Sequence, residues 1–270
     1  MVEPLPDWAP AGLDLTIPSA ARMYDYFLGG AHNFGVDREL ARKVLQAIPS
    51  ASLAVQANRA FLHRAVRYLT AQGIRQFIDI GSGIPTEGNV HETAQHEAAD
   101  ARVLYVDHDP VAVVHSELIL SGNPNATVIQ ADLRRPDDIL GSAELGKLID
   151  LSQPVAVLMV AVLHFVSAEE HPVTLIDRFR DRVAPGSYLA ISHLTADGRQ
   201  ASAQTAAGLY QSASDPMFLR NRDQVQELFT GWDLVEPGLV WVSQWRPEWP
   251  DDVGADPAAS YVYAGLAQKP

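Results

Sequence analysis

The sequence of 270 residues contains no cysteine. Disulfide bonds, thiolate zinc sites and cysteine nucleophiles are therefore excluded. The sequence also lacks a hydrophobic run of the roughly 20 residues that a bilayer-spanning helix needs. Its longest such run, from Pro154 to Val166, is shorter and is typical of a strand buried on both faces. The acidic, proline-rich N-terminus has neither the basic start nor the apolar stretch of a signal peptide, so we expect a cytoplasmic protein with no membrane partner.

Basic residues are scarce relative to acidic ones. The chain has 20 Lys and Arg against 33 Asp and Glu, which gives a formal net charge of -13. Such a chain repels phosphate backbones, so we expect no nucleic-acid partner. We interpret the adjacent Arg134 and Arg135 as part of a solvated surface. Hydrophobic residues make up 47% of the chain, which is enough for one buried α/β core with an added segment.

The first 72 residues are predicted to form an N-terminal arm and a helical cover, with the core following over 73–270. Residues 1–17 have the composition of a loose arm. Ser19 opens a helix that Gly29 and Gly30 end, because paired glycines are a strong helix stop. Two further helices are predicted over 37–48 and 52–72, the latter ended by Gly73.

From residue 75 onward, short apolar runs alternate with helical patterns. This alternation predicts βαβ units with right-handed crossovers and a parallel sheet. The predicted strands are 76–80, 103–106, 127–130, 155–161 and 188–192, and the helices are 87–99, 109–120, 136–149, 168–182, 198–212 and 221–230. Two later runs, 234–242 and 261–266, predict an antiparallel hairpin at one edge. The expected fold class is therefore α/β: a Rossmann-like, doubly wound, mostly parallel sheet with a C-terminal antiparallel hairpin and an N-terminal helical cover.

A glycine-containing loop follows the first predicted strand. Its residues Asp79, Gly81, Ser82 and Gly83 stand where that strand gives way to a helix. Glycines at these positions let the backbone turn tightly and approach a nucleoside closely. Because glycine is common in turns, this loop alone is weak support for a cofactor site.

Acidic residues end the next two predicted strands. Asp107 can accept hydrogen bonds from ribose hydroxyls, and Asp132 can accept one from an adenine amino group, with Leu133 against the ring. We expect His108 and Ala161, which also follow strands, to line the same site. The alternative is that the two aspartates only cap the following helices.

Two cofactors fit such a loop. A dinucleotide loop requires glycine at its third position, where this sequence has Thr86, and there is no obvious lysine to clamp a phosphate. S-adenosylmethionine (SAM) carries no phosphate, so SAM is the expected cofactor and NAD the alternative.

The loop with Asp79, Gly81 and Gly83, together with Asp107 and Asp132, resembles the motifs of class I SAM-dependent methyltransferases. The segment PSAARMYDYFLGGAHNF at 18–34, VAVLHF at 160–165 and SHLT at 192–195 are similar to the signature of a bacterial family of S-adenosyl methyltransferases, formerly a domain of unknown function. The resemblance covers nearly the whole chain. It implies a SAM-binding fold with an N-terminal helical cover and assigns no substrate.

By this resemblance, Gly81 to Gly83 would hold the methionine and ribose, Asp107 the ribose, and Asp132 with Leu133 the adenine. Three residues of the N-terminal block are candidates for closing the pocket: Arg22 on the SAM carboxylate, Tyr24 near the sulfonium, and Asn33. The alternative is that Tyr24 is a core contact and that Arg22 pairs with a local acid.

Histidines supply the candidate catalytic residues. His164 follows the fourth predicted strand and His193 ends the fifth, so either could act as a general base; the alternative is a hydrogen-bonded structural histidine. His91 and His96 are five residues apart rather than the four of a zincin helix, so we interpret them as solvated and expect no metal. Trp241, Trp245 and Trp249 are expected to pack along the last strands rather than to form a substrate box.

These features predict methyl transfer from SAM to an unidentified, small-molecule acceptor. Alignment of donor and acceptor would be the main contribution of the enzyme to the rate. Two alternatives remain at this point: a non-catalytic SAM-binding scaffold or interaction protein, and an NAD-dependent oxidoreductase.

Overall fold

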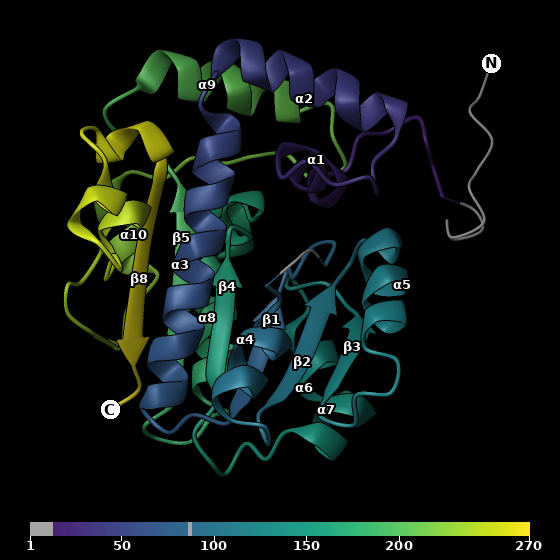
Figure 1. Ribbon diagram of the computed structural model, residues 1–270, viewed down its shortest axis with the longest axis vertical. Helices are drawn as coiled ribbons and strands as arrows, with labels where there is room; N and C mark the ends of the chain where they lie inside the picture. Colours follow the sequence, from purple (N-terminus) through teal and green to yellow (C-terminus); the bar gives the residue numbers. More distant parts are fainter. Residues whose placement is uncertain (1–12, 86–87) are drawn as a thin grey trace.

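A single mixed sheet forms the centre of the computed structural model, which describes residues 13–85 and 88–270 (Figure 1). Its order is β3-β2-β1-β4-β5-β8-β6, with β7 also paired to β8. The strands β1 to β5 are parallel, whereas β6, β7 and β8 run antiparallel to their partners. Their bounds are β1 Gln76–Ile80, β2 Arg102–Asp107, β3 Ala126–Gln130, β4 Ala156–Val160, β5 Tyr188–Leu194, β6 Asp233–Leu234, β7 Val240–Trp241 and β8 Val262–Gln268. The predicted fold class is thereby confirmed.

The five parallel strands lie where the sequence predicts them. Each is a short run of apolar residues, and β1 and β5 are buried along nearly their whole length. Helices pack on both faces of the sheet, so these strands need no polar face. The reversal of strand order between β1 and β4 creates the crevice in which open α/β sheets bind ligands.

The crossover helices are shorter than predicted. They are α4 Val90–Glu97, α5 Pro110–Ile119, α6 Pro136–Leu140, α7 Ala143–Leu148 and α8 Pro172–Arg180. The single helix predicted over 136–149 is wrong: Gly141 ends α6, and the Ser142 hydroxyl caps α7. The helix predicted over 168–182 is likewise divided, because His171 adopts a left-handed φ of 52° before Pro172, a position that disfavours the helical conformation.

The predicted strand over 234–242 is wrong as a single element. Only β6 and β7, at its two ends, pair with β8, and residues 235–239 leave the ladder. Pro237 has no backbone N–H to donate to a neighbouring strand, and Gly238 has a φ of +81°, which an extended strand does not use. The antiparallel pairing at this edge, between β6 and β8, is as predicted.

Helices from both ends of the chain cover the carboxyl edge of the sheet (Figure 1). They are α1 Ala20–Phe27, α2 Gly35–Ala47 and α9 Gln200–Tyr210; the short α10 Arg222–Glu227 lies beside β8. One buried cluster joins Met23 and Phe27 of α1 with Val44 of α2 and Ala206 and Tyr210 of α9. The predicted cover therefore exists, and it includes α9, which lies about 160 residues after α2 in the sequence.

The long helix α3 Ala51–Ala71 connects this cover to the sheet. Its Phe61 and Leu69 belong to the same buried cluster as Phe77 of β1 and Leu158 of β4. Trp245 is fully buried and meets Phe61 edge to face, with ring centroids 5.3 Å apart. Helices from residues 20–71 thus pack against both the cover and the sheet, and the division of the chain at residue 72 stays a prediction.

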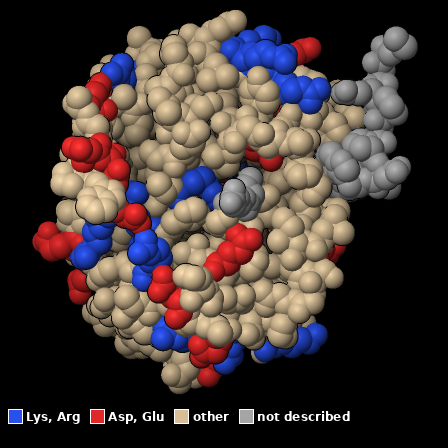
Figure 2. Space-filling model, viewed as in Figure 1, with Lys and Arg blue, Asp and Glu red and all other residues tan. Residues whose placement is uncertain are grey.

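Acidic and basic side chains are interspersed over the face shown in Figure 2, with a basic group at the edge above α2. Within 13–85 and 88–270, no helix is long and apolar enough to span a membrane. The same residues contain no cluster of His, Asp or Glu that could hold a metal ion. A cavity lies in the interior of the molecule, above the sheet.

Candidate functional site

The cavity lies at the carboxyl ends of the parallel strands, beneath α1, α2 and α9. Its lining divides into two parts by the elements that supply it. The strand-end half is made by residues after β1, β2 and β3, namely Gly81, Gly83, Asp107, His108, Asp132, Leu133 and Arg134. The helix-side half is made by α1, α2, α3 and α9, by the segments after β4 and after α9, and by residues beside β8. Its members include Tyr24, Phe27, Val44, Ile48, Ala51, Ala54, Val55, Asn58, Phe165, Ala203, Ala206, Tyr210, Met217, Leu219 and Tyr261. The end of β4, with Ala161, Val162 and His164, lies between the two halves.

The turn after β1 requires glycine. Gly81 has a φ of +69°, and its N–H donates to the Val106 carbonyl at 2.8 Å, so the turn is fastened to β2. A Cβ atom at Gly81 would lie 2.3 Å from Cγ2 of Val162, which is far inside contact distance. The neighbouring Ser82 hydroxyl is buried and makes no hydrogen bond to any part of the chain that the structure describes. A polar atom left in this state indicates a missing partner.

Asp107 is placed by its own neighbours. One carboxylate oxygen accepts the Gly83 N–H at 2.7 Å, and the other accepts the Asp109 N–H at 2.9 Å. Burial raises the pKa of Asp107, against the opposing effect of His108. The helix α5 is capped by Asp109 instead, whose carboxylate accepts the Val111 N–H. Capping of the following helix therefore does not explain Asp107, which faces the cavity.

Asp132 and Arg134 form the far wall of the strand-end half. The Asp132 carboxylate accepts the Arg134 N–H at 2.8 Å, and the guanidinium lies 3.3 Å from the same carboxylate. Arg134 also pairs with Glu170 at 2.8 Å and donates to the Phe165 carbonyl. The interpretation of Arg134 as a solvated residue is wrong, whereas Arg135 is exposed and pairs only locally with Asp138. The place of Arg134 in the cavity could not be deduced from the sequence, because its partners Glu170 and Asp215 come from distant segments of the chain.

His108 contacts the loop that follows α9. Its Nε2 lies 3.3 Å from the Asp215 carboxylate, and this hydrogen bond raises the pKa of His108 to about 9. The Asp215 carboxylate is also 3.8 Å from the Arg134 guanidinium. Asp215 thus bridges the strand-end half to the cover, and nothing in the sequence around it marks this role.

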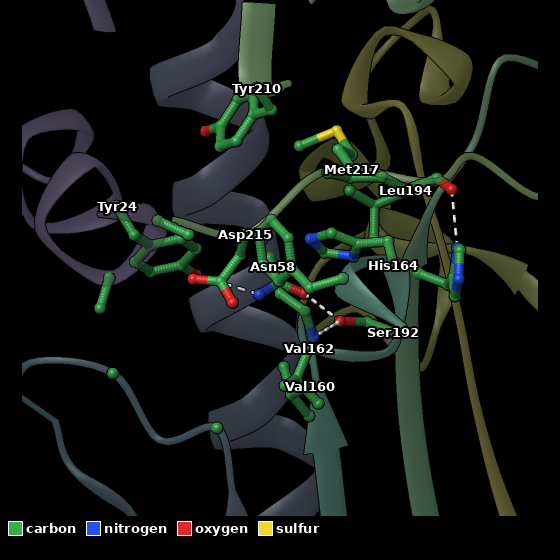
Figure 3. Close-up of a pocket in the computed structure, with 18 of the residues that line it drawn as sticks. Tyr24, Asn58, Val160, Val162, His164, Ser192, Leu194, Tyr210, Asp215 and Met217 are labelled. Atoms are coloured by element: carbon green, nitrogen blue, oxygen red, sulfur yellow. Dashed lines mark hydrogen bonds between the residues drawn. The ribbon is translucent and has the colours of Figure 1, made fainter. Parts of the chain in front are cut away.

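A chain of hydrogen bonds fastens the cover to the end of β4 (Figure 3). The Ala161 N–H donates to the Ser192 hydroxyl at 2.9 Å, which in turn donates to Oδ1 of Asn58 at 2.5 Å. The Asn58 amide then donates to the Tyr24 hydroxyl at 3.0 Å. Each group uses one donor in the same direction, so the chain is internally consistent. Ala161 itself has a φ of 59°, a left-handed conformation that costs a non-glycine residue about 1–2 kcal/mol.

The two candidate histidines differ in what remains open to a ligand. His193 contacts the Leu194 carbonyl through Nδ1 at 2.7 Å and Arg220 through Nε2 at 2.8 Å. Burial, with Arg220 beside the ring, lowers the pKa of His193 to about 3. Its Nε2 lone pair already accepts a hydrogen bond from Arg220, so His193 is a hydrogen-bonded structural histidine and not a general base.

His164 is buried and lines the cavity, and its Nδ1 has no hydrogen-bond partner among the described residues. Burial lowers the pKa of His164 well below its ordinary value, with His193 and Arg220 adding to the effect. The ring is therefore neutral near neutral pH, and its Nε2 is the nitrogen left to face the cavity.

Four predicted site residues lie outside the lining of the cavity: Arg22, Asn33, Asp79 and Ser82. Arg22 pairs with Asp37 at 3.1 Å and donates to the Ile17 carbonyl, in accordance with the local-acid alternative. Asn33 donates to the Asp25 carboxylate at 2.8 Å, so it fixes the turn after α1. Asp79 is buried behind the glycine turn, where burial raises its pKa to about 7. Tyr24, in contrast, lines the cavity, and its role toward the cofactor stays a prediction.

Other sequence interpretations have mixed outcomes. His91 is not solvated but buried, with its Nδ1 2.8 Å from the Tyr105 hydroxyl, whereas His96 is exposed. Trp241 stacks on Tyr263 of β8, and Trp245 packs beneath α3, so both serve the edge of the sheet. Trp249 is 70% exposed. Thr86, the residue that distinguishes the loop from a dinucleotide loop, lies outside the described residues.

A family model described as S-adenosyl methyltransferase matches residues 6–270. The chain belongs to this family. A domain-of-unknown-function protein from Streptomyces avermitilis has 37% identity to it, with coverage of 94% of this chain and 98% of that chain and a TM-score of 0.91. A candidate methyltransferase from Thermobifida fusca has 38% identity, with coverage of 98% and 99% and a TM-score of 0.92. The N-methyltransferase NodS from Bradyrhizobium japonicum has 13% identity over 86% of this chain and 97% of that chain, with a TM-score of 0.52, and shares the fold alone. No curated protein matches the chain.

Membership of the S-adenosyl methyltransferase family makes SAM the cofactor of this chain, and the strand-end half fits it. A carboxylate offers about four lone-pair positions, and Asp107 uses two of them on backbone N–H groups, which leaves acceptors for ribose hydroxyls. Asp132 with Leu133 provides an acceptor and an apolar surface for adenine. A Cβ atom at Gly83 would meet nothing within 4 Å, so the backbone beside Gly83 is open to a ligand. The expected donor set and the observed cavity therefore agree.

Proposed function

We propose that this methyltransferase transfers the methyl group of SAM to a small-molecule acceptor that enters the helix-side half of the cavity. The observation that carries this proposal is the continuity of the two halves across the end of β4. SAM, when bound, supplies an electrophilic methyl group on sulfur. A bond then forms from the acceptor atom to the methyl carbon as the carbon–sulfur bond breaks, with its electron pair left on sulfur. The products are the methylated acceptor, S-adenosylhomocysteine and the proton released by the acceptor.

The residues of the chain contribute mainly by alignment. The glycine turn, Asp107 and Asp132 would fix the cofactor, and the hydrogen-bond chain from Ala161 to Tyr24 would hold the wall between the halves rigid. Such positioning replaces a bimolecular encounter by an effectively unimolecular step. Closure by α1, α2 and α9 would exclude water from the methyl group. His164, with Nε2 toward the cavity, is the group placed to accept the proton of the acceptor.

Label transfer tests this function directly. The purified protein is incubated with methyl-labelled SAM and a bacterial metabolite extract, and both labelled products and S-adenosylhomocysteine are measured. We expect stoichiometric formation of the two. Tight binding of SAM without transfer in any extract would instead favour the non-catalytic scaffold.

A thermal-shift panel of SAM, S-adenosylhomocysteine and NAD(H) accompanies this assay. Only a ligand that binds the native state raises the unfolding midpoint. We expect a shift with the first two ligands. A shift with NAD(H) alone would contradict the proposal.

A further inference from the structure

The helix-side half of the cavity carries no charged side chain. Among the described residues, the Asp and Arg side chains that line the cavity, Asp107, Asp132, Arg134 and Asp215, all lie at the strand ends or bridge to them. The remaining surface comes mostly from alanine, aliphatic, methionine and aromatic residues, and its polar members, such as Asn58, Ser192 and Thr195, are uncharged. This distribution separates two chemically different spaces within one cavity.

An ionised acceptor would therefore lose its hydration without gaining a partner. Burying an unpaired carboxylate or ammonium is so unfavourable that such groups neutralise instead. A charged acceptor would need a counter-ion in the wall, and none of the described residues of the helix-side half supplies one. The composition of the wall thus selects uncharged acceptors.

Aromatic rings shape the same half. Tyr24 and Phe27 of α1, Phe165 after β4 and Tyr210 of α9 line it, and Phe165 and Tyr210 lie with ring centroids 6.1 Å apart. Aromatic side chains prefer to meet planar partners face to face with an offset or edge to face. Walls of this kind accommodate a planar ring better than a branched aliphatic body.

Two polar groups remain open to a ligand, one in this half and one at its border with the strand-end half. The Tyr210 hydroxyl makes no hydrogen bond to a described residue, and burial raises its pKa, so it stays neutral. His164 faces the cavity from the end of β4, and Figure 3 shows its imidazole below Tyr210 and Met217. One neutral donor and one neutral imidazole suit a hydroxyl group, which both donates and accepts.

We infer, on the basis of the proposed function, that the acceptor is an uncharged aromatic hydroxy compound whose hydroxyl lies at His164. The acceptor oxygen bonds to the methyl carbon, the carbon–sulfur electron pair stays on sulfur, and the hydroxyl proton passes to Nε2 of His164. Because burial disfavours a charged His164, the imidazolium is short-lived and passes its proton on to solvent in the same turnover. Atoms and charge therefore balance with SAM as the only co-reactant.

Three matched probes test this inference: 2-naphthol, 2-naphthoate and 2-naphthylmethylammonium, which share one ring system and differ in charge. Each is titrated calorimetrically into the protein saturated with S-adenosylhomocysteine. We expect 2-naphthol to bind at least about tenfold more tightly than either ion, which corresponds to ~1.4 kcal/mol. Equal or tighter binding of either ion would overturn the inference.

Substitutions on α9 locate the probe. Ala206→Leu fills the helix-side half, and we expect it to weaken 2-naphthol binding at least about tenfold while the affinity for S-adenosylhomocysteine is kept. Ala203→Leu serves as a second variant, since it lines the same space and is checked by circular dichroism alongside Ala206→Leu. Ala201→Leu is the control, because Ala201 is exposed on the same helix and lies outside the lining. Wild-type binding of 2-naphthol by both lining variants would contradict the inference.

The initial titration of S-adenosylhomocysteine separates two failures. No binding of this ligand would contradict the proposed function itself. Binding of S-adenosylhomocysteine together with preference for a charged probe would contradict only the acceptor class.

Discussion

The two halves of the cavity differ in how they are built. The strand-end half gathers three segments that each follow a parallel strand, within residues 81–134. The helix-side half gathers α1, α2 and α3 with α9 and Tyr261, so its walls come from nearly the full length of the chain. The first half carries charged side chains and glycines of positive φ, whereas the second carries mostly apolar surface and no charged side chain among the described residues.

Under the proposed function, this difference would let a methyltransferase keep its cofactor site while its acceptor site varies. Strand ends in an α/β sheet are fixed by the sheet itself, so the cofactor groups inherit their positions from the core. The cover is held by helix packing and by a few polar contacts, such as the bond from Asn58 to Tyr24. Changes in its alanines or aromatics would reshape the acceptor space without disturbing the turn at Gly81.

The largest expected effect separates cofactor binding from support of the cover. Arg22→Met removes the partner of Asp37, whose side chain is fully buried and also accepts the Ser19 and Phe34 N–H groups. Leaving a buried charge unpaired costs about 3–5 kcal/mol, which chemical denaturation would measure. The folded variant should bind SAM nearly as well as the wild type, because Arg22 lies outside the cavity.

Arg42→Met is the matched control for Arg22→Met, because Arg42 is exposed on α2. Its stability should change by no more than about 0.5 kcal/mol. If Arg22→Met kept the stability of the wild type but lost much of its SAM affinity, Arg22 would be a cofactor-binding residue and not a support of the cover.

The next effect belongs to the strand-end half alone. Gly81→Ala places a Cβ atom against Val162 at a φ of +69°, so the turn must move. Overpacking of this kind costs ~1–3 kcal/mol, and we expect SAM affinity by calorimetry to fall at least about tenfold. Gly122→Ala is the control, since Gly122 has a φ of +85° and open space around it. Equal SAM affinities in Gly81→Ala and Gly122→Ala would contradict a role of the Gly81 turn in SAM binding.

A smaller effect concerns the contact between the halves. Asp215→Asn should lower the pKa of His108 from about 9 toward the ordinary value near 6.5, as measured by NMR titration of the imidazole. Because the folded-state pKa is raised, the pair stabilises the native state fully below about pH 6.5 and loses this effect as the pH rises through about 9. Asp100→Asn, at an exposed carboxylate, should leave the titration of His108 unchanged. An unaltered His108 pKa in Asp215→Asn would disprove the bridge.

The smallest effect tests the strained wall between the halves. Ala161→Gly relieves a left-handed conformation, which offsets the entropy that glycine loses on folding, so stability should change by less than about 0.5 kcal/mol. Ala201→Gly, on the exposed face of α9, should cost about 1 kcal/mol in the same urea titration. A loss at Ala161 as large as that at Ala201 would mean that its backbone carries no strain.

The strand-end half could be predicted from the sequence because its signals are local. Gly81, Asp107 and Asp132 each stand directly after an apolar run, and parallel strands bring such positions to one edge. Asp79 and Arg22 were predicted to take part and do not line the cavity. Asp79 is buried within β1, and Arg22 pairs with Asp37, fifteen residues away along the chain.

The helix-side half could not be predicted in this way. Ala206 on α9 and Met217 in the segment after it are apolar residues of the kind that fill any core, and nothing in the sequence distinguishes a cavity wall from a filled core. Asn58 and Ser192 are polar residues inside apolar elements, 134 positions apart, and only their hydrogen bond reveals a shared role. The prediction of one strand over 234–242 was wrong for a local reason. It relied on the apolar pattern and ignored the break that Pro237 and Gly238 impose.

A crystal structure of the protein with S-adenosylhomocysteine tests the central claim most directly. The account predicts the ribose at Asp107, the adenine between Asp132 and Leu133, and the sulfur directed past Ala161 toward the helix-side half. A nucleoside bound away from these three groups, with the turn at Gly81 unoccupied, would contradict it.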